Sequence, residues 1–155
     1  MQFVNYFFAS IISFLGLLIG ILLVEIAPEE QKPLRKYFIL LRKTILFLIF
    51  IFLVFFYFSN AFNILTLLVY SAFLLFVEYK VNDLHKKSII VYGIIGILFF
   101  LSSRNLNLFV IESSLILLYG ITTASLIYNK KERNIHKILF YNVIFVLIVN
   151  LLFFV

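Results

Sequence analysis

The stretch Thr44–Val77, TILFLIFIFLVFFYFSNAFNILTLLVYSAFLLFV, carries no charged side chain and decides the class of fold. A helix crosses the hydrocarbon core of a bilayer with about 20 apolar residues, so this run is too long for one crossing. Near its middle, the segment Ser59-Asn60-Ala61-Phe62-Asn63 contains turn-forming residues. We therefore predict two membrane-spanning helices here, with a connection at residues 59–63.

The whole chain has the apolar character of this stretch. Of its 155 residues, 65% are hydrophobic and 13% are charged, against roughly 45–50% and 25% in soluble domains. So few charged side chains cannot cover a water-soluble globule, which excludes a soluble enzyme, a soluble nucleic-acid-binding protein and a disordered chain. A backbone in lipid must satisfy its own hydrogen bonds, and the chain lacks the alternation of barrel strands. The sequence predicts an all-α protein.

The charge-free runs predict a polytopic bundle of six transmembrane helices in a single domain covering residues 1–155. The polar segment 102–107 separates the fourth helix from the fifth. Five crossings with one re-entrant segment are the alternative. The predicted spans are 3–24, 38–58, 63–79, 88–103, 107–128 and 138–155.

The basic residues predict the orientation of this bundle. All of the 13 Lys and Arg residues except Arg104 fall in the first, third and fifth loops. By the positive-inside rule these loops are cytoplasmic, and both termini lie outside the plasma membrane. Arg42 and Lys43, near the start of the second span, are expected to extend toward the headgroups.

The formal net charge of +6 is interpreted through the same loops. Basic loops of membrane proteins contact anionic lipid, so membrane lipids, and not nucleic acid, are the predicted partners. The residues predicted to face lipid on the cytoplasmic side are Arg35, Lys36, Lys86, Lys87, Lys130 and Lys131.

Glu112 is the one acidic residue inside an apolar segment, and it is the candidate functional residue. An ionisable group in lipid is costly, and such groups often mark functional sites. One interpretation makes Glu112 a proton or cation site together with Ser113 and Ser114. The other places it near the helix N-terminus, where it reaches Arg104 or water.

Three carboxylates in the first loop, on Glu25, Glu29 and Glu30, offer oxygen ligands for a divalent cation. Pro28 followed by two acids is also typical of a helix start, and basic residues follow closely. We favour helix capping over a metal site. The chain has no cysteine, so no thiolate site or disulfide is proposed.

Small residues mark surfaces where helices pack closely in lipid. We expect packing within one bundle at these positions, with use of the first helix in a homo-oligomer or a larger membrane complex as the alternative. Asn142 and Asn150 are expected to form hydrogen bonds between helices. The small residues are Gly16, Gly20, Gly93, Gly96, Gly120 and Ala124.

Two functional hypotheses follow from these features. The near absence of polar residues at mid-membrane favours a non-enzymatic membrane-embedded subunit or scaffold. The alternative is a small transporter or channel for an ion or small solute that uses Glu112, with Ser113, Ser114 and Asn142. No acid, base and nucleophile converge and no cofactor motif is present, so we expect neither enzymatic activity nor a cofactor.

The segments Gly16-Leu-Leu-Ile-Gly20, Glu25-Ile-Ala-Pro-Glu-Glu30 and Tyr37-Phe38 together carry a resemblance. This part of the chain, residues 16–38, resembles the first hairpin of small, very hydrophobic archaeal membrane proteins of uncharacterised function. The resemblance implies an archaeal plasma membrane and no particular activity. The abundance of Phe, Ile, Lys and Asn is typical of a low-GC prokaryotic genome.

Overall fold

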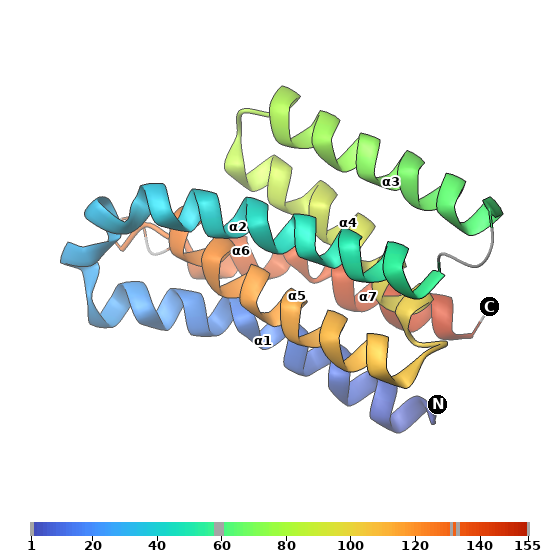
Figure 1. Ribbon diagram of the computed structural model, residues 1–155. Helices are drawn as coiled ribbons and strands as arrows, with labels where there is room; N and C mark the ends of the chain where they lie inside the picture. Colours follow the sequence, from blue (N-terminus) through green and yellow to red (C-terminus); the bar gives the residue numbers. More distant parts are fainter. Residues whose placement is uncertain (1, 58–60, 131, 133, 155) are drawn as a thin grey trace.

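Helices account for nearly all of the chain in the computed structural model, which describes residues 2–57, 61–130, 132 and 134–154 (Figure 1). The all-α prediction is confirmed. The helices are α1 (Phe3–Ile26), α2 (Pro28–Tyr57), α3 (Ala61–Lys80), α4 (Leu84–Ser102), α5 (Leu106–Ile127), α6 (Ile135–Asn142) and α7 (Ile144–Phe153).

The last two helices form one continuous rod. The backbone N–H of Val143 donates to Leu139 O at 3.0 Å, and that of Leu147 donates to Val143 O at 3.1 Å, so the i to i−4 pattern crosses the junction. Counted as one segment, Ile135–Phe153 joins α1, α2, α4 and α5 as five helices long and apolar enough to cross a membrane. With α3 the bundle contains six rods.

The second helix begins ten residues before the predicted span 38–58. It starts at Pro28, with Glu29 and Glu30 in its first turn. Proline suits the first helical position because its missing N–H has no partner there, and acids complement the positive helix end. The predicted connection at residues 59–63 falls partly outside the described residues, since the description stops at Tyr57 and resumes at Ala61.

The most extensive helix interface joins α1 to α5, and glycine makes it possible. A Cβ on Gly16 would lie 2.0 Å from Leu117 O, and one on Gly20 would lie 2.3 Å from Ile121 O. Ser13 Oγ donates to Ser113 O at 3.1 Å in the same interface. The two backbones therefore touch, and any side chain larger than hydrogen at these glycines would separate them.

The residue numbers of the contacting partners increase in the same direction along α1 and α5, so the two helices run parallel. Ser13 meets Ser113, Gly16 meets Leu117, and Gly20 meets Ile121. Two parallel helices must be separated by an odd number of membrane crossings. The three helices α2, α3 and α4 meet this requirement. A re-entrant α3 would make α1 and α5 antiparallel, so their parallel contact fits six crossings and not a re-entrant α3. Figure 1 accordingly places the α1–α2, α3–α4 and α5–α6 connections at one end and both termini at the other.

The glycines of α4 receive a side chain from α7. The nearest atoms to a Cβ on Gly96 are Ile148 Cγ2 at 3.2 Å and Ile148 Cβ at 3.4 Å, whereas a Cβ on Gly93 would meet Ile148 Cδ1 at 3.7 Å. Near the end that holds the termini, Tyr6 is fully buried and its hydroxyl donates to Val149 O at 3.0 Å. These contacts hold α7 against α1 and α4.

The different environments of the glycines provide a matched test of the packing. We expect Gly16→Ala to lower the free energy of unfolding by about 1–3 kcal/mol, because the added methyl group overlaps Leu117 O. Gly93→Ala meets only an ordinary van der Waals contact and gains helix propensity, so it should be neutral or stabilising. Thermal unfolding of both variants in the same detergent checks the prediction, and equal shifts would contradict it.

Candidate functional site

Three charged side chains from three helices meet inside the bundle. Arg42 Nη2 of α2 donates to Glu78 Oε1 of α3 at 2.7 Å. Lys87 Nζ of α4 lies 3.6 Å from the same carboxylate oxygen and donates to the Glu78 backbone oxygen at 2.7 Å. Glu78 thus joins two cations and ties α3 to its neighbours.

This triad is buried, and two predictions about it were wrong. Arg42 is only 1% exposed and Lys87 only 7%, so neither extends to the headgroups or faces lipid. Along α2, Arg42 lies six residues beyond Lys36, or about 9 Å further into the bundle. The cations stay inside because a carboxylate is available there, and a buried pair is less costly than a lone charge.

Hydroxyl groups of α4 and α5 extend the triad into a larger polar centre. Tyr92 and Tyr119 are fully buried, with ring centroids 5.5 Å apart. Thr123 lies beside Tyr119 on the next turn of α5, and this helix packs against α2, which carries Arg42. We define the polar centre as Arg42, Glu78, Lys87, Tyr92, Tyr119 and Thr123.

The polar centre contains groups that the described part of the chain does not satisfy. Nε and Nη1 of Arg42 and Oε2 of Glu78 are buried without a hydrogen-bond partner among the described residues. The hydroxyl of Tyr92 is buried without a partner as well, whereas the buried hydroxyls of Tyr119 and Thr123 lie beside each other and have no further partner among the described residues. Buried polar groups are normally paired, so such a concentration of polar atoms is suited to binding a ligand, an ion or water.

Glu112 lies on the same side of α5, two turns before Tyr119. It is fully buried, and both of its carboxylate oxygens lack a partner within the described residues. Residues seven apart on an α-helix are nearly in line, at about 10.5 Å along the axis. Glu112 is therefore neither exposed to headgroups nor part of the triad.

The other residues of the predicted ion site are not gathered around Glu112. Arg104 is exposed in the turn between α4 and α5. The hydroxyls of Ser113 and Ser114 both donate to Val110 O, at 3.0 and 2.8 Å, and the side chain of Ser114 is exposed. Of the four predicted residues, only Glu112 has the surroundings of a functional group.

Asn142, the further residue of the transporter hypothesis, lies beside the polar centre and not beside Glu112. Its Oδ1 accepts a hydrogen bond from Ser88 Oγ at 2.7 Å, and its Nδ2 donates to Ile138 O at 2.8 Å. Ser88 follows Lys87 on α4, so this bond holds α6 next to the helix that carries the lysine.

At the start of α4, Asp83 accepts the N–H of His85 at 2.9 Å, and this bond lowers the pKa of Asp83.

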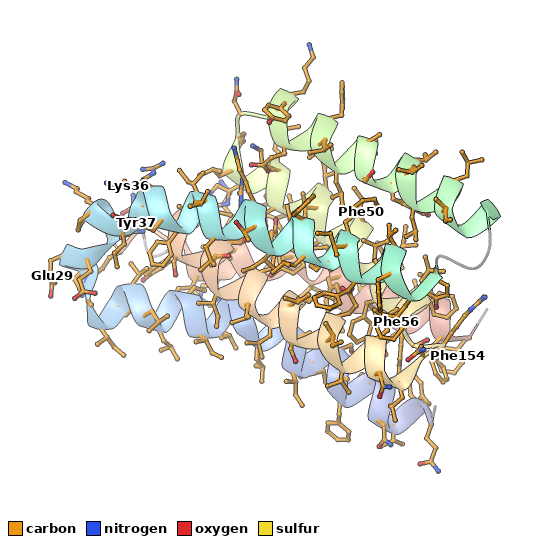
Figure 2. The ribbon with its side chains drawn as sticks, viewed as in Figure 1. Glu29, Lys36, Tyr37, Phe50, Phe56 and Phe154 are labelled. Carbon is orange, nitrogen blue, oxygen red and sulfur yellow. The ribbon has the colours of Figure 1, made fainter. Side chains whose placement is uncertain are left out.

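The remaining basic residues of the lipid-facing prediction lie at the surface. Arg35, Lys86 and Lys130 are exposed, and so is Lys36, which points away from the bundle near the beginning of α2 (Figure 2). Lys131 lies outside the described residues. Whether a lipid headgroup meets these side chains stays a prediction.

The first-loop carboxylates are separated by the fold. Glu25 accepts the hydroxyl of Tyr128 and lies 3.7 Å from Lys130 Nζ, whereas Glu29 and Glu30 are exposed on the first turn of α2. Within the described ranges, no three His, Cys, Asp or Glu side chains gather as a metal site would require. The polar centre is thus the candidate functional site, and its groups are suited to binding charge.

Sequence reasoning could have found part of this site. Glu78 falls at the end of the predicted span 63–79, and an acid there, with Arg42 at the start of the previous span, was an available signal. Tyr92 and Tyr119 gave no such signal in the sequence, because tyrosine is also common in lipid-facing positions. No protein-family model, characterised protein or solved structure matches this chain.

Removing the acid of the triad is expected to cost more stability than removing one of its two cations. Glu78→Gln leaves two buried cations without a carboxylate and is expected to cost about 3–5 kcal/mol of unfolding free energy. Arg42→Met should cost less, because Lys87 remains as a counter-charge for Glu78. Glu132→Gln, at an exposed side chain, should change the unfolding free energy by no more than about 0.5 kcal/mol. Denaturation in mixed micelles measures all three, and a larger loss in Arg42→Met than in Glu78→Gln would contradict the assignment.

Proposed function

We propose that this multi-span membrane protein is a small, non-enzymatic transporter or channel whose pathway runs through the polar centre. The observation that carries the proposal is the convergence of buried, unpartnered polar atoms from α2, α3, α4 and α5. An unpaired polar group in a low-dielectric interior costs about 1–3 kcal/mol, more if charged, and such groups persist where function needs them. The transported species is an ion or a small polar solute.

The pathway follows one side of α5. Glu112, Tyr119 and Thr123 lie at offsets of seven and four residues, which places them on one face of the helix. Tyr119 and Thr123 lie on the helix that packs against α2, which carries Arg42, and Glu112 continues their line toward the beginning of α5. From Glu112 to Thr123 these groups supply donors and acceptors over about 17 Å of helix, roughly half of the hydrocarbon thickness.

A membrane-embedded subunit or scaffold is the second candidate. It was suggested by the scarcity of polar residues at mid-membrane, and the buried polar centre weakens that argument. One observation still favours it: α3 exposes a continuous apolar face that a partner helix in a larger complex, or a second copy in a homo-oligomer, would cover. The exposed residues of this face include Leu65, Leu68, Val69, Phe73 and Phe76.

We also propose the plasma membrane as the location, with the basic loops on the cytoplasmic side. The support is the charge asymmetry, because all Lys and Arg residues except Arg104 fall within 32–43, 80–87 or 130–137, around the α1–α2, α3–α4 and α5–α6 connections. The archaeal resemblance of residues 16–38 agrees with a prokaryotic plasma membrane.

Reconstitution into liposomes tests transport directly. The purified protein is expected to dissipate imposed proton, chloride or potassium gradients faster than protein-free liposomes do, as followed by an internal pH-sensitive or ion-sensitive dye. Glu112→Gln should lower that flux, because it removes the titratable carboxyl while breaking no hydrogen bond of the described structure. Tyr119→Phe should lower it as well by removing one hydroxyl.

Ser114→Ala is the matched control, since this exposed side chain lies on the same helix and bonds only to Val110 O. Its flux should equal that of the wild type. Absence of flux for every gradient would exclude these ions as the transported species and favour the subunit hypothesis.

The orientation is tested with single cysteines, which the cysteine-free chain permits. In intact cells, a membrane-impermeant maleimide should label Arg104→Cys but not Lys86→Cys, because the two exposed positions lie at opposite ends of the bundle. Permeabilisation should expose Lys86→Cys to the reagent. Labelling of Lys86→Cys from outside would reverse the proposed orientation.

A further inference from the structure

A second site lies away from the polar centre, where the beginning of α2 passes the end of α5. The structure contains a cavity of about 560 Å³ there, lined on the α2 side by Gln31, Lys32 and Arg35. On the other side it is lined by residues 125–130, which include Ile127 and Lys130.

The walls of this cavity are held in place by hydrogen bonds between the two helices. Gln31 Nε2 donates to Ser125 O at 2.9 Å and to Tyr128 O at 2.8 Å, which satisfies two carbonyls at the end of α5. Lys130 Nζ donates to Glu25 O at 3.1 Å, which brings the end of α1 to the same place. The cavity is therefore part of the folded bundle and not a gap between mobile ends.

The charge of the lining has one sign. Lys32, Arg35 and Lys130 contribute three cations, and no lining residue is acidic. Glu25 outside the lining lies 3.7 Å from Lys130, whereas Lys32 and Arg35 form no ion pair within the described part of the chain. Two unpaired basic side chains, one of them a guanidinium, are suited to the oxygens of a phosphate group.

The position of the cavity identifies the source of that phosphate. The apolar runs of α1 and α5 end at Val24 and Ile127, and charged residues follow at Glu25 and Lys130. Because apolar residues end and charged residues begin at this level, we take it as the border between hydrocarbon and headgroups. Leu126 and Ile127 add an apolar wall directly beside the cations.

We propose that this cavity binds the phosphate headgroup of an anionic phospholipid. Lys32 and Arg35 donate to the phosphate oxygens, and the apolar wall contacts the glycerol and the first methylene groups of the tails. The site is independent of the transport proposal, because it shares no residue with the polar centre and its test involves no flux.

The test compares lipids and variants in detergent, using the rise in unfolding temperature of the full chain as the measure of binding. Short-chain phosphatidylglycerol should stabilise the wild type at lower concentrations than phosphatidylcholine with the same tails. The double variant Lys32→Gln/Arg35→Gln should weaken the phosphatidylglycerol effect roughly 30-fold, since each basic residue near a lipid surface contributes about 1 kcal/mol.

The control variant Lys80→Gln/Lys137→Gln removes two charges from exposed residues that neither line the cavity nor belong to the predicted lipid-facing set. It should leave the affinity within about twofold of the wild type, because charges exposed to water and not in contact with the bound headgroup interact with it only weakly. Equal losses in the two double variants would show general attraction to charge and overturn the proposal. Equal stabilisation by inorganic phosphate would assign the cavity to a free anion, and equal stabilisation by phosphatidylcholine would remove the role of charge.

Discussion

The direct contact of two helix backbones, α1 and α5, is the constraint on which the rest of the bundle depends. Gly16 and Gly20 let α1 approach so closely that a methyl group on either would overlap a carbonyl of α5. Lipid supplies no hydrophobic force between helices, so association relies on dispersion and close fit, which such an approach maximises. It also determines which side of α5 remains for the other helices.

That remaining side of α5 carries Tyr119, Thr123 and Glu112, and α2, α3 and α4 bring their charges toward it. Small residues on one face of α5 permit the contact with α1, and polar residues on another face are enclosed as a result. The glycines of α1 are used inside the chain. A homo-oligomer built on the Gly16–Gly20 surface is thus incompatible with this fold, because α5 already covers that surface.

Much of the fold was predictable, because lipid makes strict demands on a sequence. Apolar length indicated the helical spans, turn-forming residues indicated most connections, and Pro28 with Glu29 indicated the true beginning of α2.

The polar centre was predictable only in part. Arg42 and Lys87 were expected near the headgroups because long basic side chains can extend there, and nothing local in either segment reveals that Glu78 lies within 4 Å of both. Glu112 was recognised as unusual, but its separation from Arg104 and from the hydroxyls of Ser113 and Ser114 depended on which way each side chain points.

The sequence by itself determined the class of this protein, its helical spans, the alternation of basic loops and the residues small enough for close packing. These properties follow from the cost of placing charge and unpaired backbone in hydrocarbon, which each segment experiences separately. Only the tertiary structure decided that α1 and α5 run in parallel contact, that Glu78 joins two cations, and that Lys32, Arg35 and Lys130 line one cavity. Those facts depend on distances between residues far apart in the chain, and such distances exist only after the helices have packed.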